Sequence, residues 1–411
     1  MMRRQAMQDL RIQTKLRQIM DTTPAGQPIR VIVKRKKETI KTAVLHPALE
    51  VTRVFDLVPA TAGAATAETI AALEQNPDVE VVWPDLPVHT WLDVSVPLIG
   101  APQVWAAGYT GKGVVVAVVD TGVDVNHPDL VGRVTLTKDF SGEGFKDNHG
   151  HGTHVAGIAA GNGTAGNGKY KGVAPEATIY AAKVLRGDGS GLMSDVMAGV
   201  EWAVQQKAQV INLSLGSDGS CDGSDAMSAT CDAAVDQGVM LCVAAGNAGP
   251  NYYTVGSPGC ARKVLTVGAS DDNDAVTSFS SRGPTADKRL KPEILFPGYH
   301  IVACRASGTS MGTAVGSYYT EASGTSMATP HAAGVCALLL QAKPTLTPQA
   351  LKDLLVGSAK ILGADLWTYG YGRGDVHKAY LGQTHSLPPI PAPPDEQGGC
   401  LKAILRAVGL G

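Results

Sequence analysis

The chain is organised around one segment, Ser323-Gly324-Thr325-Ser326-Met327-Ala328-Thr329-Pro330-His331-Ala332-Ala333-Gly334. Its small residues predict a turn that brings Ser326 close to a bound ligand, and the apolar run from Ala332 to Leu340 predicts a buried helix after it. Amides at the start of a helix stabilise negative charge that develops beside a hydroxyl. Because a serine alone is a weak nucleophile, this segment requires a base and an acid that orients the base.

The composition bounds the class of protein. The 411 residues leave room for two or three domains, or for one large α/β unit. The 48 glycines indicate many tight turns, since average usage is about 7%. A formal net charge of −2 without a long basic run gives no reason to propose a nucleic-acid partner. The chain also lacks the ~18 successive apolar residues of a membrane span.

Seven cysteines are present, and none forms a Cys-x-x-Cys pair, which disfavours a zinc ribbon or a thioredoxin-like redox site. Cys221 and Cys231 are close enough in sequence to form a disulfide. Buried free thiols are the alternative.

The two ends of the chain are predicted to be tails. Residues 1–27 form an N-terminal tail with at most a short helix, and the polar segment Met1–Met20 lacks the apolar core of a signal peptide. Either the protein starts in the cytoplasm or a signal has already been removed. Residues 384–411 form a C-terminal tail that begins with the stiff, extended, proline-rich segment Ser386–Pro394.

Residues 28–91 are predicted to be a small α+β domain. Strand-like and helical patterns alternate along this segment. Thr66 is the expected N-cap of its clearest helix. Residues 86–97 have no clear period and are expected to be a linker. The expected strands are Arg30–Lys34, Glu50–Leu57 and Val79–Trp83, and the expected helices are Glu38–Leu45 and Thr66–Gln75.

Residues 92–383 are predicted to be a larger α/β domain. Continuous apolar runs alternate with helical patterns, which predicts a mostly parallel sheet with helices on both faces. The expected strands are Gly113–Val119, Thr178–Val184, Gln209–Leu213, Val239–Ala244 and Val264–Val267, and the expected helices are Ser194–Lys207, Asp225–Gln237, His331–Ala342 and Thr347–Val356.

Two further segments offer partners for Ser326. Asp120 ends the first apolar run, and parallel sheets place their chemistry at such carboxyl ends, although Asp-Thr-Gly after a strand is also an ordinary turn. The segment His149–Gly157 contains three histidines, whose spacing suggests a metal site at first sight. Because no fourth ligand lies nearby, a histidine at a helix start that faces a cleft is better explained as a base.

Three motifs carry a family resemblance. Asp120-Thr121-Gly122, His151-Gly152-Thr153-His154-Val155-Ala156-Gly157 and Gly324-Thr325-Ser326-Met327-Ala328-Thr329-Pro330 resemble the signature motifs of the subtilisin-like serine proteases, in that family's order. The resemblance covers about Val94 to Leu381. It implies a three-layer subtilisin-like domain and a serine endopeptidase that acts on polypeptides.

The resemblance also implies roles for individual residues. Ser326 is the expected nucleophile, His151 the general base and later acid, and Asp120 the group that orients His151. Ala244-Ala245-Gly246-Asn247 resembles the family's oxyanion segment, in which the Asn247 amide binds the oxyanion. Ser214-Leu215-Gly216 and Ala244-Ala245-Gly246 resemble the walls of the specificity pocket. They imply strand-like pairing with an extended peptide and a broad apolar or aromatic preference.

Three other residues could be mistaken for the nucleophile or the base. Ser307-Gly308-Thr309-Ser310-Met311 repeats the nucleophile motif, but neither the proline nor the apolar helix follows, so Ser310 is not expected to react. His154 is expected to pack on a helix, and His149 to lie in a loop.

Residues from about Pro28 to Trp91 resemble the inhibitory propeptide of secreted subtilases, which implies a ferredoxin-like α+β fold and self-processing. The expected cut lies near Trp91-Leu92, with Trp91 and Val88 in apolar pockets. The alternative is a permanent regulatory domain. A monomer is expected, and secretion is implied by the propeptide, with a cytoplasmic location as the alternative.

Structural calcium is implied by the family. Asp129 matches a frequent ligand position, but the segment Gly161–Lys171 has no carboxylate. Asp218, Asp222 and Asp225 form an acidic loop that either binds calcium or is solvated.

Two alternatives to an active protease stay open: a catalytically silent peptide-binding protein and a permanently self-inhibited complex.

Overall fold

The computed structural model describes residues 14–36, 45–55, 59–85, 92–217 and 219–394. The chain divides into two compact units, Met1–His89 and Thr90–Gly411, and each is described by itself. Most of the helix expected at Glu38–Leu45 lies outside the described residues, as do Trp91, Val88, Asp218 and the end of the C-terminal tail.

The smaller unit has a four-stranded sheet whose paired strands are all antiparallel, in the order β2-β3-β1-β4. Alternate residues of β1, Val31 and Val33, are buried together with Ile70 and Leu73 of the helix that follows β3. The expected cap is confirmed, because the Thr66 hydroxyl accepts a hydrogen bond from the Thr69 amide. The elements are α2 (Thr14–Thr22), β1 (Ile29–Arg35), β2 (Glu50–Val54), β3 (Ala60–Ala65), α3 (Ala67–Gln75) and β4 (Val79–Pro84).

The larger unit is built on a seven-stranded sheet in the order β11-β10-β9-β8-β5-β7-β6, and its paired strands are all parallel. The five expected strands are present. The strands are β5 (Val115–Asp120), β6 (Val134–Asp139), β7 (Thr178–Lys183), β8 (Val210–Leu213), β9 (Met240–Ala244), β10 (Leu265–Ser270) and β11 (Ile294–Pro297).

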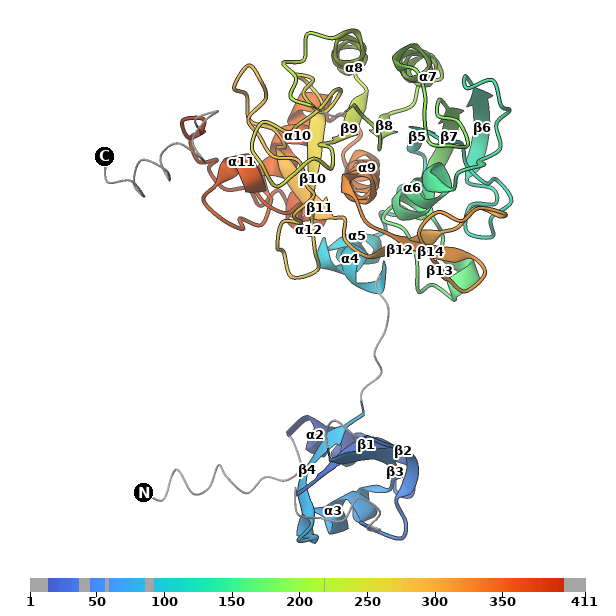
Figure 1. Cartoon of the computed structure of the whole chain (residues 1–411), viewed down its shortest axis with the longest axis vertical. Coiled ribbons are helices and arrows are strands. Elements are labelled where there is room, and N and C mark those ends of the chain that lie inside the picture. The colour runs from blue at the N-terminus through green and yellow to red at the C-terminus, as the bar shows by residue number, and fades with distance from the viewer. Residues whose placement is uncertain (1–13, 37–44, 56–58, 86–91, 218, 395–411) are drawn as a thin grey trace, which may run out of the picture. The chain divides into compact units, whose positions relative to one another are not determined.

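Helices cover both faces of this sheet, which makes three layers (Figure 1). Val116 and Val118 of β5 pack on the side of α6 and α9, while Ala117 and Val119 pack on the side of α7 and α8. This alternation is the two-residue period of a strand buried on both faces. The helices are α4 (Leu92–Leu98), α5 (Ala101–Ala106), α6 (His151–Ala160), α7 (Met193–Gln205), α8 (Ala226–Asp236), α9 (Thr325–Ala342), α10 (Pro348–Gly357), α11 (Leu366–Tyr369) and α12 (Val376–Leu381).

Two expectations about local structure are wrong. The linker expected over residues 86–97 is helical from Leu92, where α4 begins and runs through Pro97 to Leu98. Helix α9 starts at Thr325, six residues before the expected start at His331, because Pro330 is accommodated inside it. The described part of the proline-rich segment is held to the larger unit: Tyr253 Oη and Trp367 Nε1 donate hydrogen bonds to the carbonyls of Pro394 and Ala392.

The cysteine pairing also differs from expectation. Cys221 forms a disulfide with Cys260, not with Cys231. Cys231 faces inward from α8 and is buried among apolar side chains of that layer as a free thiol. Cys260 lies in the turn after Pro258 and approaches the loop that follows β8. The disulfide partner of Cys221 is therefore determined by the tertiary fold and not by closeness in the sequence.

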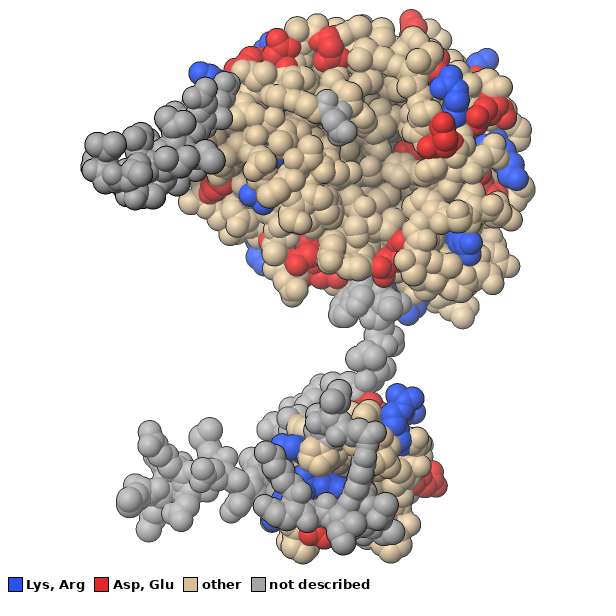
Figure 2. Space-filling view, in the orientation of Figure 1, with Lys and Arg blue, Asp and Glu red and all other residues tan. Residues whose placement is uncertain are grey.

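A small antiparallel sheet, β12-β14-β13, lies beside α6 and leads into α9 (Figure 1). Figure 2 shows that charged side chains on the visible face of the larger unit are scattered toward its rim, around a mostly uncharged middle. Among the described helices, none combines the length and the hydropathy that crossing a bilayer requires. The strands of this sheet are β12 (Ile301–Cys304), β13 (Thr313–Val315) and β14 (Tyr319–Ala322).

Candidate active site

The site lies at the carboxyl ends of three neighbouring strands. Asp120 ends β5, Ser214 follows β8, and Ala244 ends β9. The chain order reverses between β5 and β8, and such a reversal opens a crevice at the carboxyl edge of a parallel sheet. Helices α6 and α9 begin at this crevice, with His151 and Ser326 in their first turns.

Asp120 and His151 form the best-defined contact of the crevice. Their Oδ1 and Nδ1 atoms are 2.7 Å apart, and the Asp120 side chain is fully buried. Because a carboxylate accepts, Nδ1 of His151 carries the proton, and Nε2 is left as an acceptor on the pocket side of the ring. Gly152 makes this approach possible, since a Cβ there would lie 2.1 Å from the carbonyl oxygen of Gly122.

The surroundings of His151 favour its charged form. Burial lowers its pKa, but the charge of Asp120, the hydrogen bond to Asp120 and the charge of Asp147 together outweigh burial, and the pKa is raised. The imidazolium is therefore stabilised in this position, as a base that must hold a proton briefly requires.

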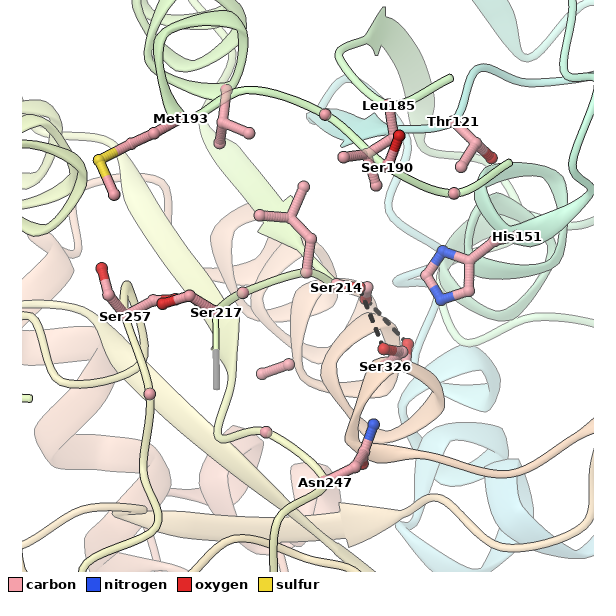
Figure 3. Close-up of a pocket in the computed structure, with 18 of the residues that line it drawn as sticks. Thr121, His151, Leu185, Ser190, Met193, Ser214, Ser217, Asn247, Ser257 and Ser326 are labelled. Atoms are coloured by element: carbon pink, nitrogen blue, oxygen red, sulfur yellow. Dashed lines mark hydrogen bonds between the residues drawn. The ribbon is translucent and has the colours of Figure 1, made fainter. Parts of the chain in front are cut away.

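Ser326 lies beside the imidazole of His151 in the pocket (Figure 3). Its hydroxyl donates a hydrogen bond to the carbonyl of Ser214 at 3.0 Å, and the Ser214 hydroxyl donates to the carbonyl of Ser326 at 2.8 Å. The second bond has a simple cause. In a regular helix the amide of residue 330 would bond to that carbonyl, but Pro330 has no N–H.

Asn247 approaches Ser326 from the loop after β9. Its Oδ1 accepts hydrogen bonds from the amide of Thr325 at 2.9 Å and from the Thr325 hydroxyl at 3.1 Å. These two donors fix the orientation of the amide group, so that its Nδ2 points to the side of the Ser326 hydroxyl (Figure 3). A side-chain donor held in this way costs little reorganisation when negative charge develops beside the serine.

A cavity of about 670 Å³ extends from these residues along the loops that follow β7, β8 and β9. All six residues expected to form the pocket walls line it: Ser214, Leu215, Gly216, Ala244, Ala245 and Gly246. The sequence did not single out the rest of the lining, which comes from three other segments and carries no motif. Those lining residues include Leu185, Leu192, Met193, Val196, Met227, Gly256 and Ser257.

Comparison with known proteins places this geometry in a family. The sequence profile described as the subtilase family matches residues 111–374. This chain belongs to the subtilase family. Serine protease AprX of Bacillus subtilis is 40% identical over 338 residues, which are 76% of either chain. Subtilisin E of the same organism is 38% identical over 334 residues, 79% of this chain and 81% of subtilisin E.

A solved structure agrees with the sequence relatives. The crystal structure of a cold adapted subtilisin-like serine proteinase superposes with a TM-score of 0.53 at 35% identity, over 65% of this chain and 88% of that one. The expected subtilisin-like fold and the assignment as a serine endopeptidase are therefore confirmed.

His154, His149 and the second serine motif of this subtilase have surroundings that differ from those of His151 and Ser326. His154 is buried, and its Nε2 lies within hydrogen-bond distance of the carbonyls of Ile301 and Thr320. Burial, foremost, lowers its pKa to about 4, so it is neutral near pH 7. His149 lies in the loop before α6, and it also lines the cavity. Ser310 lies exposed in the loop between β12 and β13.

The surroundings of Asp129 do not fit a calcium ion. Its Oδ1 accepts from the Ala165 amide at 2.7 Å, and its Oδ2 accepts from the Tyr319 hydroxyl at 2.8 Å, with the Cys304 thiol 3.8 Å away. Calcium takes six to eight oxygen ligands, whereas these neighbours are donors that already occupy both carboxylate oxygens.

The carboxylates of Asp222 and Asp225 in the acidic loop accept hydrogen bonds from other groups of the protein. Asp222 accepts from the amide and the hydroxyl of Ser224. Asp225 is the N-cap of α8 and also accepts from the hydroxyl of Ser257, which lines the cavity.

Leu92, on one side of the expected cut, is the first residue of α4.

Proposed function

We propose that this subtilase hydrolyses peptide bonds through an acyl-enzyme, with Ser326 as nucleophile, His151 as base and acid, and Asp120 as the orienting acid. The observation that carries the proposal is the 2.7 Å contact between His151 and Asp120, with Ser326 facing the other side of the same ring.

The reaction follows from the positions of the donors and acceptors. Rotation about the Cα–Cβ bond turns the Ser326 hydroxyl from the Ser214 carbonyl toward Nε2 of His151. Oγ attacks the carbonyl carbon of the substrate while its proton passes to Nε2, and the carbonyl electron pair moves to the oxygen. Nδ2 of Asn247 and the amide of Ser326 then donate to this oxyanion.

Collapse of the intermediate breaks the C–N bond as His151 returns the proton to the leaving amine. Water then attacks the acyl-enzyme, gives a proton to His151, and releases the acid product and the free Ser326 hydroxyl. Asp120 keeps its hydrogen bond to Nδ1 of His151 and stabilises each imidazolium that forms.

The cavity lining supports a preference for apolar or aromatic side chains. Leu192, Met193, Val196 and Met227 offer apolar surface, and methionine side chains adapt to ligands of different shape. The glycine-bearing segments on either side leave backbone groups available to pair with an extended peptide.

The smaller unit is proposed to be an inhibitory propeptide that the enzyme removes from itself near Trp91-Leu92. Its compactness and its own apolar core support an independently folding segment. Export as a monomer, with structural calcium bound elsewhere than at Asp129, belongs to the same proposal.

Wild type and Ser326→Ala test the processing step when they are expressed side by side and their intact masses are measured over time. Wild type should lose an N-terminal fragment that ends near residue 91 as peptidase activity rises, while Ser326→Ala stays full length. Two equally cut chains, or two uncut chains, contradict self-processing by Ser326. A wild type that binds casein without hydrolysing it supports the silent-binder alternative.

A further inference from the structure

A second buried carboxylate lies beside the triad and is used by none of the steps above. Asp147, in the loop before α6, is 1% exposed. Its Oδ1 accepts from the Thr121 hydroxyl at 3.0 Å and from the amides of His149 and Gly150 at 3.1 and 2.7 Å. Its Oδ2 accepts from the amide and the hydroxyl of Thr153 at 3.0 and 2.6 Å. Five donors therefore surround one side chain.

These donors come from the two segments that carry the catalytic residues. Thr121 directly follows Asp120, and Gly150 and Thr153 lie just before and just after His151. The Thr121 hydroxyl also accepts from the amide of Gly152 at 2.9 Å. The loop after β5 and the first turn of α6 are thereby held together twice, once by Asp120 with His151 and once behind them by Asp147 with Thr121 and Thr153.

The charge of Asp147 is held by dipoles and not by a cation. Among the described residues, no lysine, arginine or histidine forms an ion pair with it. Several N–H and O–H donors at a helix start stabilise a carboxylate, and the charge of Asp147 contributes to the raised pKa of His151. Asp147 therefore places a second negative charge near the imidazole.

Other titratable side chains also lie near His151. Asp120 contacts the ring directly, and the His149 ring centroid is 6.2 Å from that of His151. His154 on α6 is neutral, for the reason given above. Lys183 at the end of β7 donates to the carbonyl of Thr121, with Glu143 at 3.7 Å from its ammonium. Asp124 accepts from the amide of Ser307 on the far side of Thr153.

We propose that Asp147 is a positioning residue for the peptidase reaction, which fixes the distance between the Asp120 loop and the His151 helix and stabilises the imidazolium from behind. This inference rests on the proposed triad. Asp147 touches neither substrate nor the reacting atoms, so it acts through His151.

The consequence for the reaction has a definite sign. Without the charge of Asp147 the imidazolium is less stable, so the neutral, base-competent form of His151 persists to lower pH. The same loss weakens the imidazolium in the transition state, and a displaced ring is a poorer base. The acid limb of the activity profile should therefore move to lower pH while kcat falls.

Asp147→Asn in the full chain tests this proposal, with Asp375→Asn as the matched control. Asp375 also accepts from a helix-start amide, that of Lys378, but at α12 and away from the crevice. In Asp147→Asn, kcat should fall by about tenfold to a hundredfold with KM little changed. The acid limb of kcat/KM should shift down by roughly half a pH unit to one unit. Asp375→Asn should show neither change.

Thr121→Val and Thr121→Ser give a second, smaller perturbation in case Asp147→Asn folds poorly. Valine removes the hydroxyl between Asp147 and the Gly152 amide, and serine keeps it. We expect Thr121→Val to lower kcat and Thr121→Ser to restore it. The downfield NMR resonance of the His151 Nδ1 proton should titrate at lower pH in Asp147→Asn than in wild type.

The outcomes separate this proposal from the proposed function. A wild type that neither hydrolyses peptides nor reacts with a sulfonyl fluoride contradicts the triad itself. A reactive wild type with an unchanged pH profile and unchanged kcat in Asp147→Asn leaves the triad standing and overturns the role of Asp147. Equal losses in Asp147→Asn and Asp375→Asn, with equal loss of thermal stability, also overturn it.

Discussion

Thr325 fixes the orientation of the Asn247 side chain. The backbone amide and the hydroxyl of Thr325 both donate hydrogen bonds to Oδ1 of Asn247. Ser326, the proposed nucleophile, is the next residue, so the Asn247 amide and the serine are placed by the same helix start. This arrangement supports the proposed role of the turn after β9 as one side of an oxyanion site.

Asn247→Ala should lower kcat by about 10²–10³ with little change in KM, because the lost donor acts on charge that exists only in the transition state. Thr325→Val should give a smaller loss, since the Thr325 amide still orients Asn247. Steady-state kinetics on an apolar peptide amide measures both. A rise in KM at constant kcat would instead place Asn247 in ground-state binding.

The disulfide Cys221–Cys260 should support the specificity pocket. Cys260 lies three residues after Ser257, and the amide of Ser217 donates to the Ser257 carbonyl at 2.8 Å, so the bridge joins two segments of the cavity wall. Closing a loop of 39 residues contributes about 2–4 kcal/mol to the free energy of unfolding.

A thiol reductant should therefore lower the Tm of wild type and raise KM for substrates with large apolar side chains. The double variant Cys221→Ser/Cys260→Ser should have the lower Tm from the start and show no further response to the reductant. An equal response in both proteins would mean that the reductant acts elsewhere.

Acid should destabilise this subtilase through His331, which is fully buried in α9. Its ring lies 2.9 Å from the Met327 carbonyl and 2.9 Å from the Ser95 hydroxyl. Burial lowers its pKa to about 4, against an ordinary value of 6.5. The unfolded chain therefore binds the extra proton first, and stability falls as pH drops from 6.5 toward 4, by up to roughly 3 kcal/mol for this residue.

His331→Gln should flatten the dependence of Tm on pH between 6.5 and 4, even if it lowers Tm at neutral pH. His377→Gln, in a half-buried position on α12, serves as the control and should keep the wild-type slope. An unchanged slope in His331→Gln would show that other groups cause the acid sensitivity.

Asp129 should contribute to stability without calcium. Tyr319→Phe removes one donor from a buried carboxylate and should cost about 1–3 kcal/mol of unfolding free energy. The difference in Tm between buffer with calcium and buffer with a chelator should be the same in wild type and in Asp129→Asn. A calcium effect that disappears in Asp129→Asn would restore Asp129 as a ligand.

Local sequence patterns predicted the sheet of the larger unit well. The five apolar strands and the place of Asp120 follow from continuous hydrophobic runs, whereas His151 and Ser326 lie in the first turns of α6 and α9. Edge strand β6 escaped prediction because Val134–Asp139 is polar and mostly exposed, and β3 because its alanines and glycine have no strand preference.

Features that depend on segments distant in sequence could not be predicted. The disulfide partner of Cys221, the wall of the cavity around Met193 and Met227, and the donors around Asp129 are all set by tertiary folding. The start of α9 was misplaced because Pro330 was taken as a boundary, whereas the Ser214 hydroxyl supplies the hydrogen bond that the proline cannot.

Chemical labelling of the nucleophile tests the central claim most directly. The chain and its Ser326→Ala variant are treated with phenylmethylsulfonyl fluoride, digested and mapped by mass spectrometry. Our account predicts one modified peptide, which contains Ser326, with loss of activity in proportion to labelling and no modification in Ser326→Ala. Labelling at Ser310, or full activity in Ser326→Ala, would contradict it.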